Sequence, residues 1–228
     1  MTSRTDIYQI KKKMIYPSHN IIAETAYKLY LNRLLRKNFS RFLILNEFPD
    51  ISADKGLMIT PNHFSWWDGF FINYVLSKYL KRKPYLMMLE EQLSKYPFFR
   101  RVGAFSINPG SIAEIKESLS FAKKIVSSPG NYLIFYPQGE IQPNDASGIT
   151  LKKGLLHITE NSAAEVLIVS FKVCYGNKKL PDVICRFGEK YSSDFVSNNY
   201  EEYERKFKEN INIPESEDIL KNSVNILL

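Results

Sequence analysis

From residue 56 onward the chain alternates short apolar runs with longer amphipathic ones, and this alternation constrains its fold more than any other feature. Apolar runs bounded by turn residues predict buried strands, whereas apolar residues that recur every three or four positions predict helices. We expect strands over 56–60, 85–89, 103–107, 132–136, 166–173 and 183–187, and helices over 66–80, 90–95, 112–126, 154–161, 196–210 and 215–227. This order predicts an α/β fold, with a mainly parallel mixed sheet flanked by helices and with helices at the C-terminal end.

Residues 1–45 are interpreted as an N-terminal helical segment ahead of an α/β domain over 46–228. A helix is expected over 20–38, with apolar residues such as Tyr27 and Leu31 and a basic face that includes Lys28 and Arg33. Such an amphipathic helix can lie on an anionic membrane surface. It can equally pack on the main domain, and the sequence leaves both possibilities open.

The composition is that of a globular protein, because 44% of the 228 residues are hydrophobic and 24% are charged. The net charge of +7 comes from Lys and Arg pairs spread along the chain, without an Arg-rich block or a nucleic-acid-binding motif. An anionic membrane surface, or phosphorylated donors and acceptors, fits this charge as well as nucleic acid does, so charge alone does not choose. Nucleic acid is the weakest of these interpretations, and we expect none as a partner.

Location is predicted from the cysteines and from the length of the apolar runs. No signal peptide is evident ahead of Cys174 and Cys185, which predicts reduced thiols in a cytosolic protein. No uncharged apolar run reaches the roughly 18 residues needed to span a bilayer. The expected location is therefore the cytoplasm, with peripheral attachment to the cytoplasmic face of the membrane.

The stretch 61–68, Pro-Asn-His-Phe-Ser-Trp-Trp-Asp, lies between an expected strand and an expected helix. Ser65, followed by Asp68, predicts a capping box at the start of that helix. On a continuous helix His63 and Asp68 would diverge by roughly 140°, so they can meet only if the loop folds His63 back over the first turn. An ionised carboxylate there would orient the imidazole and raise its proton affinity, as a general base requires. The alternative is that Asp68 only caps the helix and His63 is a polar loop residue.

Loops that follow the carboxyl ends of parallel strands form the sites of such sheets, so the loops after 56–60, 103–107 and 132–136 are the candidates. They include three stretches: Asn62-His63-Phe64-Ser65-Trp66-Trp67-Asp68, Gly103-Ala104-Phe105-Ser106-Ile107-Asn108-Pro109 and Phe135-Tyr136-Pro137-Gln138-Gly139-Glu140. In type, order and spacing these resemble the glycerolipid acyltransferases of the lysophosphatidic acid acyltransferase type. That family carries Asn-His-x4-Asp, then Gly-x-x-Phe-Ile-Asp-Arg, then Phe-Pro-Glu-Gly-Thr-Arg. The resemblance covers about residues 50–175.

The resemblance implies an acyltransferase that takes a fatty acyl group from acyl-CoA or acyl-carrier protein and transfers it to a lipid acceptor. It implies that His63 removes the proton from the acceptor hydroxyl or amine and that Asp68 holds and polarises the imidazole. It implies neither a cofactor nor a metal ion. The residues that it implies for substrate binding are Asn62, Ser65, Gly103, Asn108, Pro137, Gln138, Gly139, Glu140 and Lys153.

The chain departs from the family where arginines hold the phosphate of the acceptor. Pro109 and Ile141 occupy those two positions, and neither can pair with a phosphate. Loss of bidentate arginine contacts removes the strongest phosphate recognition available to a protein. We therefore expect an acceptor hydroxyl without an adjacent phosphate, as in a lyso-aminolipid, a glycolipid or a carotenoid glycoside.

Two further departures lie in the third stretch, where Gln138 replaces an acidic residue and Glu140 replaces a threonine. Lys152, Lys153 or Arg101 can supply a replacement cation only if the fold brings one of them to the site. The altered stretches leave one other function open, a catalytically inactive lipid-binding or scaffold protein on the same fold.

Overall fold

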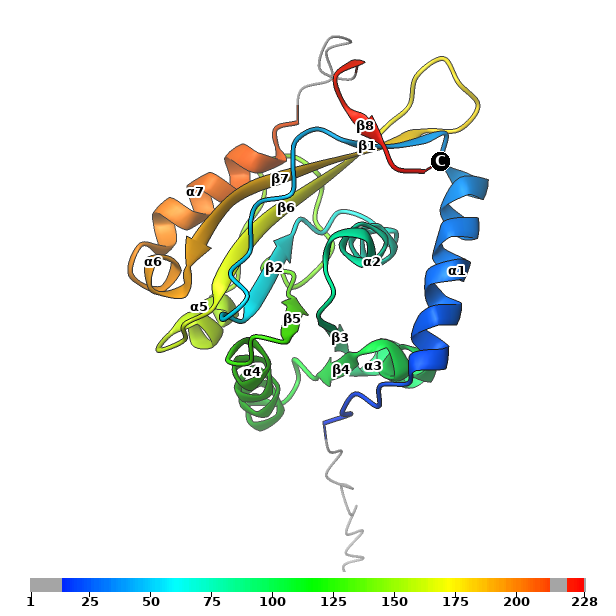
Figure 1. Ribbon diagram of the computed structural model, residues 1–228. Helices are drawn as coiled ribbons and strands as arrows, with labels where there is room; N and C mark the ends of the chain where they lie inside the picture. Colours follow the sequence, from blue (N-terminus) through cyan, green and yellow to red (C-terminus); the bar gives the residue numbers. More distant parts are fainter. Residues whose placement is uncertain (1–13, 214–220, 228) are drawn as a thin grey trace, which may run out of the picture.

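The computed structural model describes residues 14–213 and 221–227. Over these residues the chain forms one mixed sheet of eight strands with helices on both faces (Figure 1). The strands are β1 (Arg41–Ile44), β2 (Leu57–Pro61), β3 (Lys83–Leu89), β4 (Ala104–Ile107), β5 (Asn131–Ile134), β6 (Glu165–Cys174), β7 (Asp182–Ser192) and β8 (Val224–Asn225). The helices are α1 (Ile21–Asn38), α2 (Asp68–Tyr79), α3 (Glu90–Lys95), α4 (Ile112–Val126), α5 (Gly154–Thr159), α6 (Ser193–Asn198) and α7 (Tyr200–Ile211), with a 3-10 helix, η1 (Pro97–Val102).

The strand order is β4-β3-β5-β2-β6-β7-β1-β8. β2 runs parallel to β5 and β6, β3 runs parallel to β4 and β5, and β1 runs parallel to β7. Only β6–β7 and β1–β8 are antiparallel among the described pairs, which confirms the predicted mainly parallel mixed sheet. Since β2 and β5 are parallel neighbours, the loops that follow them leave the sheet side by side at its carboxyl edge.

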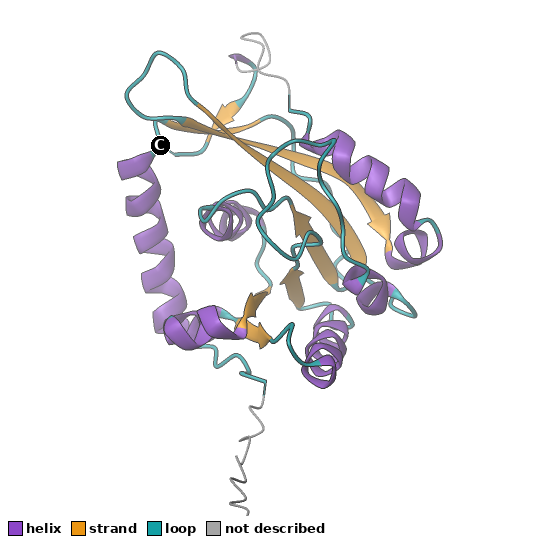
Figure 2. Ribbon diagram, turned by 180° about the vertical axis from the view of Figure 1, so that it is seen from behind, coloured by secondary structure: helices purple, strands orange, loops and turns teal. Residues whose placement is uncertain are grey.

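Each face of the sheet is covered by its own set of helices. Figure 1 shows α1 and α2 on one side and α4 to α7 on the other, and Figure 2 shows from behind how the long β6–β7 pair spans the molecule. Alternate residues of β2 serve the two cores, since Ile59 packs with α1 and α2 whereas Met58 packs with α4 and α5. This period of two is the one expected of a central strand buried on both faces.

Helix α1 packs against the main domain, one of the two possibilities that the sequence left open for residues 20–38. Leu31 and Leu35 are fully buried in the core that α1 shares with α2, and each such burial stabilises the fold by about 1.5–3 kcal/mol. The opposite side of α1 still exposes Ile22 and Leu29. Among the described residues, no helix is both long enough and apolar enough to cross a bilayer.

Local signals in the sequence predict most helix starts correctly. Asn20 caps α1 by accepting a hydrogen bond from the Ala23 N–H, and Ser111 caps α4 by accepting one from the Glu114 N–H. The expected helix over 196–210 is instead two helices, α6 and α7, which meet at Asn199. Its start at residue 193 reflects a cap by Ser192, whose hydroxyl accepts a hydrogen bond from the Phe195 N–H.

Two strands are absent from the sequence-based prediction. β1 lies within the 1–45 segment that was interpreted as helical, and it joins the sheet beside β7. The predicted helix over 215–227 is wrong at its end, because residues 224–225 form β8 against β1; residues 214–220 lie outside the described part of the chain. Both strands depend on partners far away in sequence, and no local pattern reports such pairing.

Candidate active site

The loop between β2 and α2 brings His63 and Asp68 together. His63 Nδ1 lies 2.9 Å from Asp68 Oδ2, within hydrogen-bonding distance. The contact arises because β2 ends at Pro61 and α2 begins only at Asp68, so the loop can fold His63 back over the helix start. The sequence left open whether His63 and Asp68 meet, and the fold of this loop brings them together.

Asp68 organises the whole loop. Its carboxylate accepts hydrogen bonds from the Phe64 N–H at 2.7 Å and the Ser65 N–H at 2.8 Å, and from the Ser65 hydroxyl at 3.0 Å. The Ser65 hydroxyl in turn accepts one from the Trp67 N–H. The Ser65–Asp68 pair therefore makes contacts of the capping-box type, but the helix begins at Asp68 and not at residue 66, because residues 65–67 form a turn that closes over the carboxylate.

Burial distinguishes the two members of the pair. The Asp68 side chain is completely buried, whereas 24% of the His63 side chain is exposed. Asp68 also occupies the first turn of α2, where the helix dipole favours a negative charge. With Nδ1 turned to Asp68, the other ring nitrogen, Nε2, is the one that can face a substrate.

The loop after β5 holds His63 from the other side. The Gln138 Oε1 atom accepts a hydrogen bond from the His63 N–H at 2.6 Å, and Gln138 Nε2 donates one to the His63 carbonyl at 3.1 Å. The same carbonyl accepts a bond from the Gln142 N–H at 2.9 Å. Gln138 is fully buried, so its amide supports the backbone of His63 and is already occupied by it.

Tyr136 stacks beside the imidazole and was not singled out from the sequence. The centres of the His63 and Tyr136 rings are 4.3 Å apart and their planes are inclined by 31°. The Tyr136 hydroxyl is buried and has no hydrogen-bond partner among the described residues. Burial, reinforced by the charge of Asp68, raises the pKa of Tyr136 well above its usual value. Its position in the sequence could have indicated this contact, because Tyr136 follows Ile134 by two residues and therefore lies on the same side of the sheet.

Asn62 ties the loop to β6. Its Oδ1 atom accepts a hydrogen bond from the Phe171 N–H at 2.8 Å, and its Nδ2 atom donates to the Phe171 carbonyl at 2.9 Å and to Asn144 Oδ1 at 2.9 Å. Asn62 is fully buried. The side chain expected to bind substrate thus extends the β2–β6 pairing by one residue, and Asn144, which nothing in the sequence indicated, joins it to the long loop after β5.

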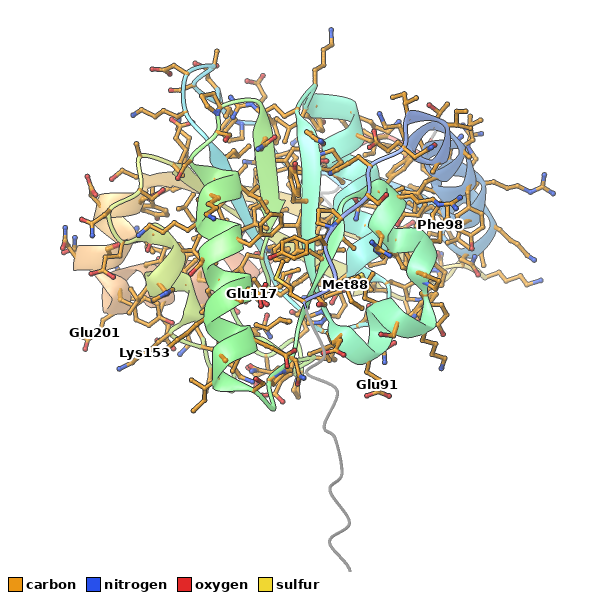
Figure 3. The ribbon with its side chains drawn as sticks, turned by 90° about the horizontal axis from the view of Figure 1, so that it is seen from below. Met88, Glu91, Phe98, Glu117, Lys153 and Glu201 are labelled. Atoms are coloured by element: carbon orange, nitrogen blue, oxygen red, sulfur yellow. The ribbon has the colours of Figure 1, made fainter. Side chains whose placement is uncertain are left out.

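The rim of the site comes from the segment that follows Gln138. Gly139 has a φ of +71°, and a Cβ there would lie 2.7 Å from Lys152 Cδ, so the lysine stem passes directly over the glycine. The Lys152 ammonium lies 3.2 Å from a carboxylate oxygen of Glu140. The buried Pro137 accepts a hydrogen bond from the Lys152 N–H. Lys153 is exposed, and Figure 3 shows it at the outer margin of the molecule, pointing away from its body.

Two of the expected site residues lie apart from His63. Gly103 stands at the amino end of β4 with a φ of +102°, and a Cβ there would meet the Pro84 carbonyl oxygen at 2.1 Å. Its role is therefore the close approach of β4 to β3. Asn108 follows β4 at the carboxyl edge and accepts a hydrogen bond from the Gly110 N–H. β3 and β5 separate β4 from β2, so at a strand spacing of about 4.8 Å the two loops start about 14 Å apart.

No group of three or more His, Cys, Asp and Glu side chains able to hold a metal ion occurs among residues 14–213 and 221–227. A cavity of about 420 Å³ opens between α1, the end of α2 and the start of β3, with Tyr27, Leu31 and Lys83 among its lining residues. It lies toward the amino edge of the sheet, and its lining includes no residue of the two loops that hold His63.

Comparison with known proteins gives the context of this arrangement. A family model described as Acyltransferase matches residues 44–173, which is more than half of the chain. No curated protein matches it. Among solved structures, the chain is similar to the crystal structure of the 1-acyl-sn-glycerophosphate (LPA) acyltransferase, PlsC, from Thermotoga maritima, with a TM-score of 0.56 and 18% identity over 82% of this chain and 76% of that one. At that identity the likeness concerns the fold.

Proposed function

Because this chain belongs to the acyltransferase family, we propose that it moves a fatty acyl group from a coenzyme A or acyl-carrier-protein thioester to a hydroxyl or amine of a lipid acceptor. The observation that carries the proposal is the contact of 2.9 Å between His63 and Asp68, with the carboxylate buried and the imidazole partly open to solvent. A buried, ionised partner and an accessible ring nitrogen are what a general base needs.

In the proposed mechanism His63 Nε2 takes the proton of the acceptor O–H while the oxygen attacks the thioester carbonyl. The attack forms the new C–O bond and a tetrahedral intermediate, and the collapse of this intermediate restores the C=O bond and breaks the C–S bond. The departing thiolate recovers the proton from the imidazolium, so no side-chain nucleophile is required. Asp68 holds Nδ1 and stabilises the imidazolium, and such a base contributes on the order of 10²–10⁴ in rate.

The acceptor that we propose carries no phosphate next to its reacting group. Ile141 is exposed at the rim where the family has an arginine, and Pro109 lies on the separate loop after β4. The lysine nearest to the rim, Lys152, is paired with Glu140 and adds no net charge. Arg101 precedes β4 and so belongs to the amino edge of the sheet. A lyso-aminolipid, a glycolipid or a carotenoid glycoside fits these residues better than lysophosphatidic acid.

The proposed location is the cytoplasmic face of a membrane, where both substrates meet. The exposed side of α1 combines Ile22 and Leu29 with basic residues that include Lys28 and Arg33. Apolar side chains with flanking cations favour an anionic lipid surface. The net charge of +7 also suits the anionic carriers of the acyl group.

The test is acyl transfer by the purified protein from palmitoyl-CoA and palmitoyl-carrier protein to a panel of phosphorylated and unphosphorylated lipids. His63→Ala is compared with His157→Ala, which alters an exposed histidine on α5. We expect an acylated product that disappears only in His63→Ala. Turnover of lysophosphatidic acid at the rate of the best other acceptor would contradict the acceptor, and no product with any acceptor would favour an inactive lipid-binding protein.

A further inference from the structure

Gln138 makes an unusual contact for a loop side chain, because its amide bonds to both the backbone N–H and the backbone carbonyl of one residue, His63. Oε1 accepts from the His63 N–H at 2.6 Å and Nε2 donates to the His63 carbonyl at 3.1 Å. A neighbouring strand would offer the same donor and acceptor pair. The side chain therefore imitates a strand at a point where no strand is present.

The backbone explains why such a substitute is needed. Pairing between β2 and β5 ends at Ile59 and Ile134, and the Phe135 N–H makes the last bond, to the Ile59 carbonyl. His63 lies beyond the end of β2, where its peptide groups face the loop after β5. Without the buried Gln138 the His63 N–H would lack a partner, and the His63 carbonyl would keep only the Gln142 N–H.

The same loop fixes the imidazole as well as the peptide. Tyr136 contacts the ring at a centroid distance of 4.3 Å, while Asp68 takes Nδ1. Rotation of the His63 backbone would move the ring away from both. The orientation of the base thus depends on the peptide that Gln138 holds.

We propose that Gln138 is a positioning residue, which fixes the orientation of His63 through two hydrogen bonds to its backbone and does not contact the substrate. The inference rests on the proposed function of His63 as the base. The Gln138 amide keeps its donor and its acceptor at every pH, so its two hydrogen bonds to the His63 backbone, here called the His63 clamp, do not depend on a protonation state of Gln138. A carboxylic acid in its place can donate to the His63 carbonyl only while it is protonated.

Gln138→Met removes both hydrogen bonds at similar volume, and Gln138→Glu makes the donor depend on pH. A displacement of the base by about 1 Å costs on the order of 10²-fold in rate, so we expect kcat of Gln138→Met to fall by that factor with little change in KM. For Gln138→Glu we expect added loss of kcat at alkaline pH, where the wild type keeps its rate. Among the described residues, the titratable groups in this loop or in contact with it are His63, Asp68, Tyr136, Asp145, whose carboxylate accepts hydrogen bonds from Ser147, and the pair of Lys152 and Glu140.

Gln92 provides the control, because it is an exposed glutamine on α3, outside the two loops that hold His63. Gln92→Met and Gln92→Glu make the same side-chain changes as the two Gln138 variants. We expect them to leave kcat and its pH profile as they are in the wild type.

Amide hydrogen exchange at His63 reports the His63 clamp without any acyl transfer. We expect a protected His63 N–H in the wild type and in both Gln92 variants, and rapid exchange in Gln138→Met. Lost protection with unchanged kcat would overturn the positioning role while leaving the proposed function intact. A protected but inactive wild type would refute the proposed function itself, and the positioning role would fall with it.

Discussion

Replacement of Asp68 by asparagine should separate the two tasks of this carboxylate, which builds the loop and, in the proposed mechanism, polarises the base. One carboxylate oxygen, Oδ2, receives the Phe64 N–H, the Ser65 N–H and His63 Nδ1. An asparagine oxygen at the same place can accept all three. The amide nitrogen would then replace Oδ1, and the Ser65 hydroxyl, which donates to Oδ1, would have to turn and accept. The loop should therefore survive without the charge.

The magnitudes follow from the change in acceptor. A hydrogen bond to a charged group is worth about 1.5–3 kcal/mol and one between neutral groups about 0.5–1.5 kcal/mol. Over the two backbone amides, Asp68→Asn should lower the free energy of unfolding by about 2 kcal/mol. Asp68→Ala leaves both partly buried amides without an acceptor and should cost about 2–6 kcal/mol. Since the imidazolium loses its counter-charge in either variant, kcat should fall by about 10²–10⁴ in both.

Two measurements on the same preparations test this reasoning. Urea denaturation gives the free energy of unfolding, and thiol release from the acyl donor, with mass spectrometry of the lipid product, gives kcat. Asp54→Asn, at an exposed loop position, controls for loss of an aspartate charge as such. An Asp68→Asn enzyme within about threefold of the wild-type rate would refute the role of the charge. Equal destabilisation by Asn and Ala would refute the role assigned to Oδ2.

Three further predictions concern other parts of the molecule. Tyr136→Phe removes a buried hydroxyl without a partner and keeps the ring beside His63, so the free energy of unfolding should stay level or rise by up to about 1 kcal/mol with kcat retained; Tyr136→Leu should lower kcat, and equal rates for the two variants would contradict the packing role. Burial, opposed by Glu24, lowers the pKa of His19 from its usual 6.5, so the unfolded chain binds the proton more readily than the folded one. The free energy of unfolding should therefore fall as the pH drops below 6.5 through the folded value. His19→Gln should flatten this pH dependence in urea titrations at several pH values, and an unchanged slope would contradict the prediction. Ile141→Arg should raise kcat/KM for phosphorylated acceptors relative to neutral ones by about tenfold or more, measured in competition, because a charged hydrogen bond is restored at the rim; no change in preference would place the acceptor headgroup elsewhere.

Much of the fold could be predicted because its signals are local. The alternation of apolar and amphipathic runs reports the α/β class, and Asn20 and Ser111 mark the starts of α1 and α4 through caps that involve only the next three residues. The pairing of His63 with Asp68 is also nearly local, since five positions of chain separate them and a single loop decides whether they meet. Such features depend on a few neighbouring dihedral angles, so sequence alone carries them.

Only the tertiary structure decided which residues share the site. Gly103 and Gln138 stood in equally plausible motifs, yet strand direction sends Gly103 to the amino edge while the β2–β5 pairing brings Gln138 onto the His63 backbone. β1 and β8 likewise exist only through each other and through β7. In each case the partner lies tens of residues away, and the free energy that selects it comes from long-range pairing and burial. The sequence determined most helices and strands and the two residues of the proposed base, His63 and Asp68, and the order of strands in the sheet determined what surrounds them.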